Sequence, residues 1–266
     1  MISHRYPRYI LLLVTVLFLP GLKASSADDL VSGARLYQIH CAGCHGAKGE
    51  GGRGTVLAMP KLSRAETEEA LINVITEGIP GTEMLRARLD KEQIRQVAAW
   101  VRKLGQMPPL EIAGDAGRGK QLYFGKGDCA SCHTIKTQGG VSGPDLTEIG
   151  LRRGIEYLRK SLLEPEADVP ENFSQHRWHT VIPDNFLQVR VVTKDGQRIT
   201  GVRLNEDTFS IQLRDLAGRI HSFSKSDLTE LHKDWGKSFM PGYRGVFSPE
   251  ELDDVIAFLL SLRAAQ

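Results

Sequence analysis

The chain has 266 residues, of which 41% are hydrophobic and 25% are charged, and its formal charge is +2. This length is enough for two compact domains, each with a core of its own. The near-neutral charge argues against a nucleic-acid-binding protein.

The first 27 residues have the pattern of a secretory signal peptide. Basic residues up to Arg8 precede an apolar run from Ile10 to Leu19, and small residues follow, so cleavage is expected near Ala27. The alternative is a membrane anchor, but the run is shorter than the roughly 20 residues that span a bilayer. Cleavage removes three basic residues and no acidic one, which leaves a formal charge of −1. We expect a periplasmic or otherwise extracytoplasmic protein with no transmembrane span in the mature chain.

The pattern Cys-x-x-Cys-His occurs twice and uses all four cysteines. This spacing is typical of c-type haem attachment, because residues i, i+3 and i+4 share one face of a helix. Two thiols on that face can bond to the haem vinyl groups, and the imidazole of the next residue can bind the iron. The sequence therefore predicts two covalently attached c-type haems, on Cys41 and Cys44 and on Cys129 and Cys132, with His45 and His133 as axial iron ligands.

Residues 28–105 are expected to form a first helical domain. A capping-box pattern that begins at Ser63 predicts a helix ending before Gly78, and a second such pattern at Asp90 predicts a final helix. The loop between these two helices carries Met84. This half resembles a class I cytochrome c domain. The resemblance implies that Met84 is the second axial ligand and that the carbonyl group of Pro60 orients the ligand histidine. Met59 is a nearby rival of Met84.

Residues 106–115 contain a Pro-Pro pair and are expected to form a linker. The pattern of the first half then returns in residues 116–266, where Gly119–Tyr123 corresponds to Gly33–Tyr37 and a capped helix starts at Ser248. The two halves are therefore expected to be repeats of one architecture.

The second half carries an insertion at about residues 184–230. Alternating residues predict strands at 187–192, 199–204, 209–213 and 219–223, and Asp195-Gly196 is a strong hairpin signal. The expected fold class is thus mainly α, with two cytochrome c-like helical domains and a small β-strand insertion in the second.

Residues from about 117 onward resemble the planctomycete-type putative haem-binding domain. The resemblance rests on the second haem motif, Gly143-Pro144-Asp145-Leu146, the inserted strands and Met240-Pro241. It implies that Pro144 parallels Pro60 and that Met240 is the second axial ligand. His232 is the best alternative to Met240. Three further histidines also compete, namely His176, His179 and His221.

Ligation by histidine and methionine leaves no open position on the iron and suits one-electron transfer. We therefore expect an electron-transfer protein rather than an enzyme: a soluble carrier, or the cytochrome subunit of a dehydrogenase or respiratory chain, with redox proteins as partners. The alternatives are a dihaem peroxidase-like enzyme with one open haem and a haem-based sensor module. Three arginines could pair with haem propionates or lie on a solvated surface, namely Arg53, Arg152 and Arg153.

Overall fold

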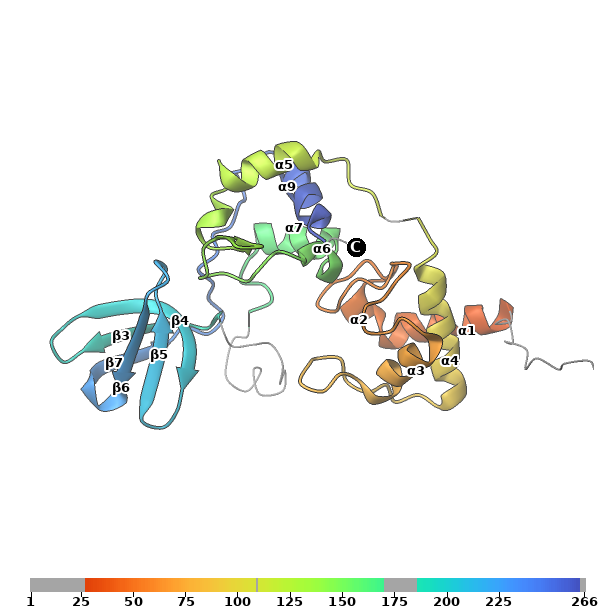
Figure 1. Cartoon of the computed structure of the whole chain (residues 1–266), viewed down its shortest axis with the longest axis horizontal. Helices are drawn as coiled ribbons and strands as arrows, with labels where there is room; N and C mark the ends of the chain where they lie inside the picture. Colours follow the sequence, from red (N-terminus) through yellow and green to blue (C-terminus); the bar gives the residue numbers. More distant parts are fainter. Residues whose placement is uncertain (1–26, 109, 170–185, 264–266) are drawn as a thin grey trace, which may run out of the picture.

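The computed structural model describes residues 27–108, 110–169 and 186–263. Within these ranges the buried side chains form three separate clusters, one in the first half, one in the helices of the second half and one in the inserted sheet. Figure 1 shows these parts as a first group of helices, a second group of helices and a sheet to one side.

The described ranges contain no helix that is both long and apolar enough to cross a membrane. The predicted signal segment lies outside them except for Ala27, where the first helix begins. The candidate ligands His176 and His179 also lie outside the described residues.

In the first half, one predicted helix start is wrong and the other is confirmed. The helix expected from Ser63 begins at Glu68 instead, because the hydroxyl group of Thr67 accepts a hydrogen bond from the N–H of Ala70 and caps it. The capping box predicted at Asp90 is present. The helices are α1 (Ala27–His40), α2 (Ala42–His45), α3 (Glu68–Glu77) and α4 (Lys91–Leu104).

The first and last helices of each half cross at a glycine. A Cβ atom on Gly33 of α1 would lie 2.0 Å from the carbonyl oxygen of Gln96 in α4, so only glycine permits this approach. In the second half, a Cβ atom on Gly119 would lie 1.9 Å from the carbonyl oxygen of Asp254. The predicted correspondence of the two halves is therefore confirmed at the helix crossings.

The second half repeats the helical arrangement with additions. The capping box at Ser248, with Pro249 at the first helical position, is present as predicted. A two-stranded hairpin that the sequence analysis missed follows the second haem motif. The elements are α5 (Ala116–Phe124), the 3₁₀ turn η1 (Cys129–Ser131), β1 (Thr134–Ile135), β2 (Gln138–Gly139), α6 (Ile149–Arg152), α7 (Ile155–Leu163) and α9 (Pro249–Ser261).

The insertion forms a five-stranded antiparallel sheet in the order β6-β5-β4-β3-β7. The four predicted strands and the hairpin at Asp195-Gly196 are confirmed, but a fifth strand returns to pair with β3 and carries the sheet to Lys233. Because the sheet has its own core, a mainly α fold with a small insertion describes the chain only roughly. The strands are β3 (Gln188–Thr193), β4 (Arg198–Glu206), β5 (Ser210–Arg214), β6 (Ile220–Ser224) and β7 (Leu228–Lys233).

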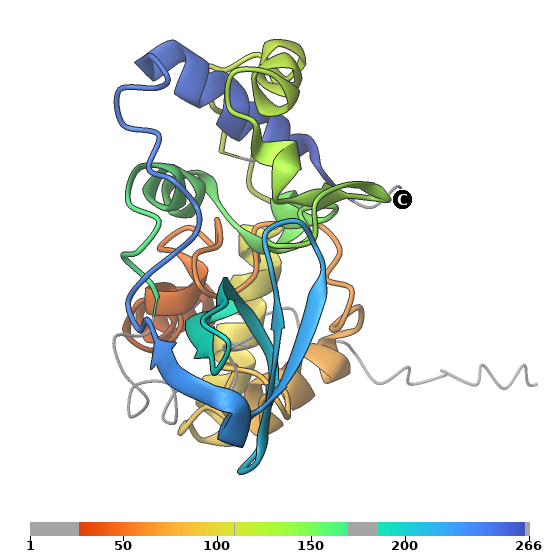
Figure 2. The same ribbon diagram turned by 90° about the vertical axis from the view of Figure 1, so that its left-hand side faces the viewer.

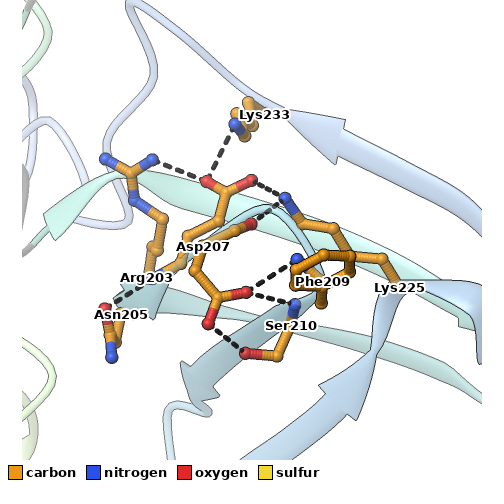
Figure 3. Close-up of polar contacts among 8 residues, drawn as sticks. Arg203, Asn205, Asp207, Phe209, Ser210, Lys225 and Lys233 are labelled. Atoms are coloured by element: carbon orange, nitrogen blue, oxygen red, sulfur yellow. Dashed lines mark hydrogen bonds and ion pairs between the residues drawn. The ribbon is translucent and has the colours of Figure 1, made fainter.

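Two neighbouring carboxylates hold the turn between β4 and β5 (Figure 3). Glu206 is mostly buried and accepts charged hydrogen bonds from Arg203, Lys225 and Lys233, each at 2.8 Å. Asp207 accepts backbone N–H groups of the turn at 2.6 and 2.7 Å. The polar contacts therefore link three strands at one end of the sheet.

Candidate haem-binding sites

The first Cys-x-x-Cys-His segment follows directly on α1 and turns through α2. The N–H of His45 donates to the carbonyl oxygen of Cys41 at 2.9 Å, which closes one helical turn and brings both cysteines and the histidine to one side. Cys41 is half-buried, Cys44 is exposed, and both are free. Burial, with the neighbouring Cys44, raises the pKa of the Cys41 thiol to about 11.

The His45 ring is held by the loop that follows it. Its Nδ1 lies 2.8 Å from the carbonyl oxygen of Thr55. A Cβ atom on Gly54 would lie 2.7 Å from Cε1 of the ring, so the backbone lies flat against the imidazole. Because a carbonyl group can only accept, Nδ1 carries the proton and Nε2 keeps a free lone pair.

The prediction that the carbonyl group of Pro60 orients His45 is therefore wrong. Pro60 is exposed, and Thr55 supplies the carbonyl group five residues earlier. The short glycine-rich loop returns to the ring before the chain reaches Pro60. Aligning Gly54-Thr55-Val56-Leu57 with Gly143-Pro144-Asp145-Leu146 in the sequence would have found Thr55.

The second site has the same arrangement. The N–H of His133 donates to the carbonyl oxygen of Cys129 at 2.9 Å, and Nδ1 lies 2.8 Å from the carbonyl oxygen of Pro144. A Cβ atom on Gly143 would lie 2.7 Å from the ring. The position of Pro144 agrees with the orienting role that the sequence analysis expected of it. The hydroxyl group of Ser142, beside this glycine, is buried and has no hydrogen-bond partner in the described structure.

Both imidazoles are in a state that suits the role of metal ligand. Burial lowers the pKa of His45 and of His133, and the backbone hydrogen bond opposes this effect only in part. The neutral ring is the form that binds iron, and a hydrogen bond from Nδ1 to a carbonyl group is the usual way to hold such a ligand. With two free thiols on the same turn, each site fits a covalently bound haem.

A buried tyrosine supports each histidine turn. The hydroxyl group of Tyr37 donates to the carbonyl oxygen of Gly46 at 2.7 Å, and that of Tyr123 donates to the carbonyl oxygen of His133 at 3.3 Å. Burial raises the pKa of both phenols, so they stay protonated donors. The two tyrosines end the matching sequence segments Gly33–Tyr37 and Gly119–Tyr123, but the sequence pattern does not reveal this role.

The two candidate methionines sit in similar loops ahead of the last helix of each half. The N–H of Met84 donates to the hydroxyl group of Thr82 at 3.2 Å, and that of Met240 donates to the hydroxyl group of Ser238 at 3.1 Å. Both side chains are half-buried and line hollows. Each methionine lies on a different loop from the histidine of its half. Its role as an iron ligand stays a prediction.

An ion pair links the loop of Met84 to the loop that holds His45. Arg53, next to Gly54, lies 2.6 Å from Glu83, next to Met84. The two other arginines considered for propionates also bind protein groups. Arg152 pairs with Glu148 on its own helix, and Arg153 donates to backbone carbonyl groups of the first half.

Two of the competing histidines belong to the inserted sheet. Nε2 of His221 lies 2.9 Å from Asp215, and the ring stacks on Phe223. His232 lies exposed on β7, and its Nε2 is 3.2 Å from Glu230. In both histidines, Nε2 is therefore already paired with a carboxylate of the insertion.

Comparisons with known proteins agree with these two sites. The profile of the cbb3-type cytochrome c oxidase subunit III family matches residues 28–101, and the cytochrome c profile matches residues 116–188. A cytochrome c6 of Nostoc sp. strain PCC 7120 is 37% identical over 82 residues, which are 28% of this chain and 70% of that protein. A cytochrome c6-like protein of the same organism is 32% identical over 97 residues, or 34% of this chain and 86% of that protein.

The chain belongs to the c-type cytochromes. It contains two cytochrome c-type domains, which imply electron transfer and covalently bound haem. This c-type cytochrome is also 30% identical over 159 residues to the cbb3-type cytochrome c oxidase subunit FixP of Rhizobium etli. That match covers 53% of each chain, so the cytochrome spans about half the length of this oxidase subunit.

Proposed function

We propose that this cytochrome is a dihaem electron carrier, with one haem in residues 28–105 and one in residues 116–266. The observation that supports this most strongly is that both histidines have the same environment. In each, Nδ1 donates to a backbone carbonyl oxygen at 2.8 Å, a glycine lies flat against the ring, and Nε2 is left free for iron.

Each half supplies a complete set of donors. The cysteines would bind the haem covalently, and the imidazole and a thioether would bind its iron. Such ligation leaves no position for peroxide or oxygen and raises the reduction potential relative to anionic ligation. The bound haem supplies a one-electron couple. The proposed iron ligands are His45 with Met84 and His133 with Met240.

The carrier would work outside the cytoplasmic membrane, after cleavage of the signal peptide near Ala27. Covalent haem attachment to this motif is typically completed in that compartment. Its partners would be redox proteins, with a dehydrogenase as donor and an oxidase or another cytochrome as acceptor. The matches to cbb3-type oxidase subunits support a partner within a respiratory chain.

A redox titration followed by low-temperature paramagnetic resonance tests this proposal. The wild-type protein should contain two haems per chain, both low-spin in the ferric state. Met84→Ala should turn one haem high-spin and lower its potential, and Met240→Ala should do the same to the other.

Met59→Ala tests the rival ligand of the first haem, and the exposed Met107 provides a control in Met107→Ala. Both variants should leave the two signals unchanged. If the wild type has a high-spin haem that turns over peroxide, the carrier function is wrong and a peroxidase takes its place. If it reversibly binds carbon monoxide at one ferrous iron, a sensor takes its place.

A further inference from the structure

The two cytochrome halves touch through backbone, between residues 50–56 and residues 151–154. The N–H of Val56 donates to the carbonyl oxygen of Leu151 at 3.3 Å. A Cβ atom on Gly154 would lie 2.2 Å from the carbonyl oxygen of Glu50, so the absence of a side chain is what allows the approach. In both ribbon views the loop after α2 lies against α6 (Figures 1 and 2).

Arg153 reaches across this contact. Its Nη1 donates to the carbonyl oxygens of Gly52 at 3.0 Å and Arg53 at 2.5 Å. Its guanidinium group lies over the ring of Tyr157, 4.6 Å from the centroid, which holds it in position. Hydrogen bonds from a charged donor are roughly twice as strong as neutral ones, so Arg153 acts as a clamp between the halves.

In the first half, this contact is connected to His45, the proposed iron ligand. Nδ1 of His45 donates to the carbonyl oxygen of Thr55. The same peptide group carries the N–H of Val56, which bonds to Leu151 in the other half. One peptide group therefore connects the first imidazole to the second half of the chain.

On the second side, the connection continues to the other histidine. Leu151 lies in α6, whose first residue, Ile149, donates its N–H to the carbonyl oxygen of Leu146 at 3.1 Å. Leu146 stands two residues after Pro144, and the carbonyl oxygen of Pro144 accepts from Nδ1 of His133. A continuous path of covalent and hydrogen bonds thus joins the two imidazoles. Along this path, the hydrogen bond from Val56 to Leu151 is the step that crosses between the halves.

We infer that this contact is the route by which the two haems exchange electrons, with Arg153 and Gly154 as positioning residues. The inference rests on the proposed dihaem function. One electron would pass in either direction between the haem that His45 would hold and the haem that His133 would hold; one iron would be oxidised and the other reduced, with no proton transferred and no bond changed. Domains in one chain move relative to one another unless an interface holds them, so electron exchange along a fixed path needs such an interface.

Two variants open the contact from the second half. Gly154→Ala places a methyl group against the backbone of Glu50 and Gly51, both of which belong to the first half. The φ angle of −93° at this position suits alanine. Arg153→Ala removes the clamp, and Arg153→Lys restores a charged donor. The control is Arg152→Ala, because Arg152 is exposed and pairs with Glu148 on its own helix.

The experiment uses the fully haem-loaded chain. It measures electron exchange between the haems separately from the association of the two halves. Rapid partial reduction should show an intramolecular phase, independent of protein concentration, in the wild type and in Arg152→Ala. This phase should be lost in Arg153→Ala and Gly154→Ala and partly return in Arg153→Lys. Small-angle scattering should show a larger radius of gyration in the two alanine variants, while the potentials and spin states of both haems stay unchanged.

An intramolecular rate that stays the same in Arg153→Ala and Gly154→Ala overturns the inference, whether or not scattering shows the halves apart. Failure of the proposed function has a different signature. In that case the wild-type protein itself lacks two low-spin haems that titrate reversibly.

Discussion

The carbonyl oxygen of Thr55 lies 2.8 Å from Nδ1 of His45, in the position that Pro144 takes against His133. In each half a backbone carbonyl group thus orients the histidine ring, although the residues that provide this group differ. This relationship gives the first two predictions.

Thr55→Pro should leave the first haem site intact. Proline already occupies the equivalent position in the second half and keeps its carbonyl group. If the local backbone suits it, proline should raise the free energy of unfolding by about 0.5 kcal/mol, because it restricts the unfolded chain. Thermal unfolding and the visible spectrum check this. Loss of the first haem in Thr55→Pro would contradict the equivalence of Thr55 and Pro144.

Gly54→Ala and Gly143→Ala should each disturb one haem. A Cβ atom at either glycine would lie 2.7 Å from its histidine ring, so the imidazole must shift away from the iron. The expected result is a lower haem content or a high-spin ferric signal in the affected half, measured by haem stoichiometry and paramagnetic resonance. Gly43→Ala is the control, since a Cβ atom there has no neighbour within 4 Å. A normal spectrum in either of the first two variants would show that the ring tolerates the contact.

Asp254→Asn should destabilise the second half. This carboxylate is buried, and it accepts from the N–H of Asp115 and from two nitrogens of Arg118. Loss of its charge weakens these bonds and should lower the free energy of unfolding by about 2 kcal/mol. Asp253→Asn, beside it on the same helix, removes a more exposed ion pair with Arg159 and should cost under about 1 kcal/mol. Chemical denaturation, followed through the absorbance of the second haem, compares the free energies of unfolding of the two variants. An equal loss of stability in both would contradict the structure.

Glu206 should make the sheet sensitive to acid. Burial alone would raise its pKa, but hydrogen bonds from Lys225, Lys233 and Arg203 outweigh this and lower the pKa from 4.5 to about 2. Because the folded-state pKa lies below the unfolded one, the stabilisation is complete above about pH 4.5 and is lost as the pH falls toward 2.

In Glu206→Gln, the free energy of unfolding of the sheet should be lower by about 2 kcal/mol at neutral pH and should change less between pH 5 and pH 2. Circular dichroism at a series of pH values measures both effects. Glu230→Gln is the matched control, because Glu230 is half exposed and pairs with the exposed His232 on the same strand. A pH dependence in Glu206→Gln equal to that of the wild type would assign the acid sensitivity to other groups.

Much of the fold could be predicted because its signals are local. The capping boxes at Asp90 and Ser248 involve groups three residues apart, and the hairpin at Asp195-Gly196 is defined by two residues. The fifth strand was missed because Leu228–Lys233 does not alternate between apolar and polar residues. Its pairing with β3 joins segments far apart in the chain, and no local pattern signals it.

The sequence by itself determined the chemistry of each site, because two cysteines and a histidine at spacings of three and four residues meet on one helical turn in any fold that contains that turn. Only the tertiary structure decided what surrounds the histidines. The carbonyl group of Thr55, the two glycines against the rings and the reach of Arg153 into the other half all depend on where the backbone returns after a loop. Backbone groups are the same in every residue, so a sequence pattern does not reveal which of them come together.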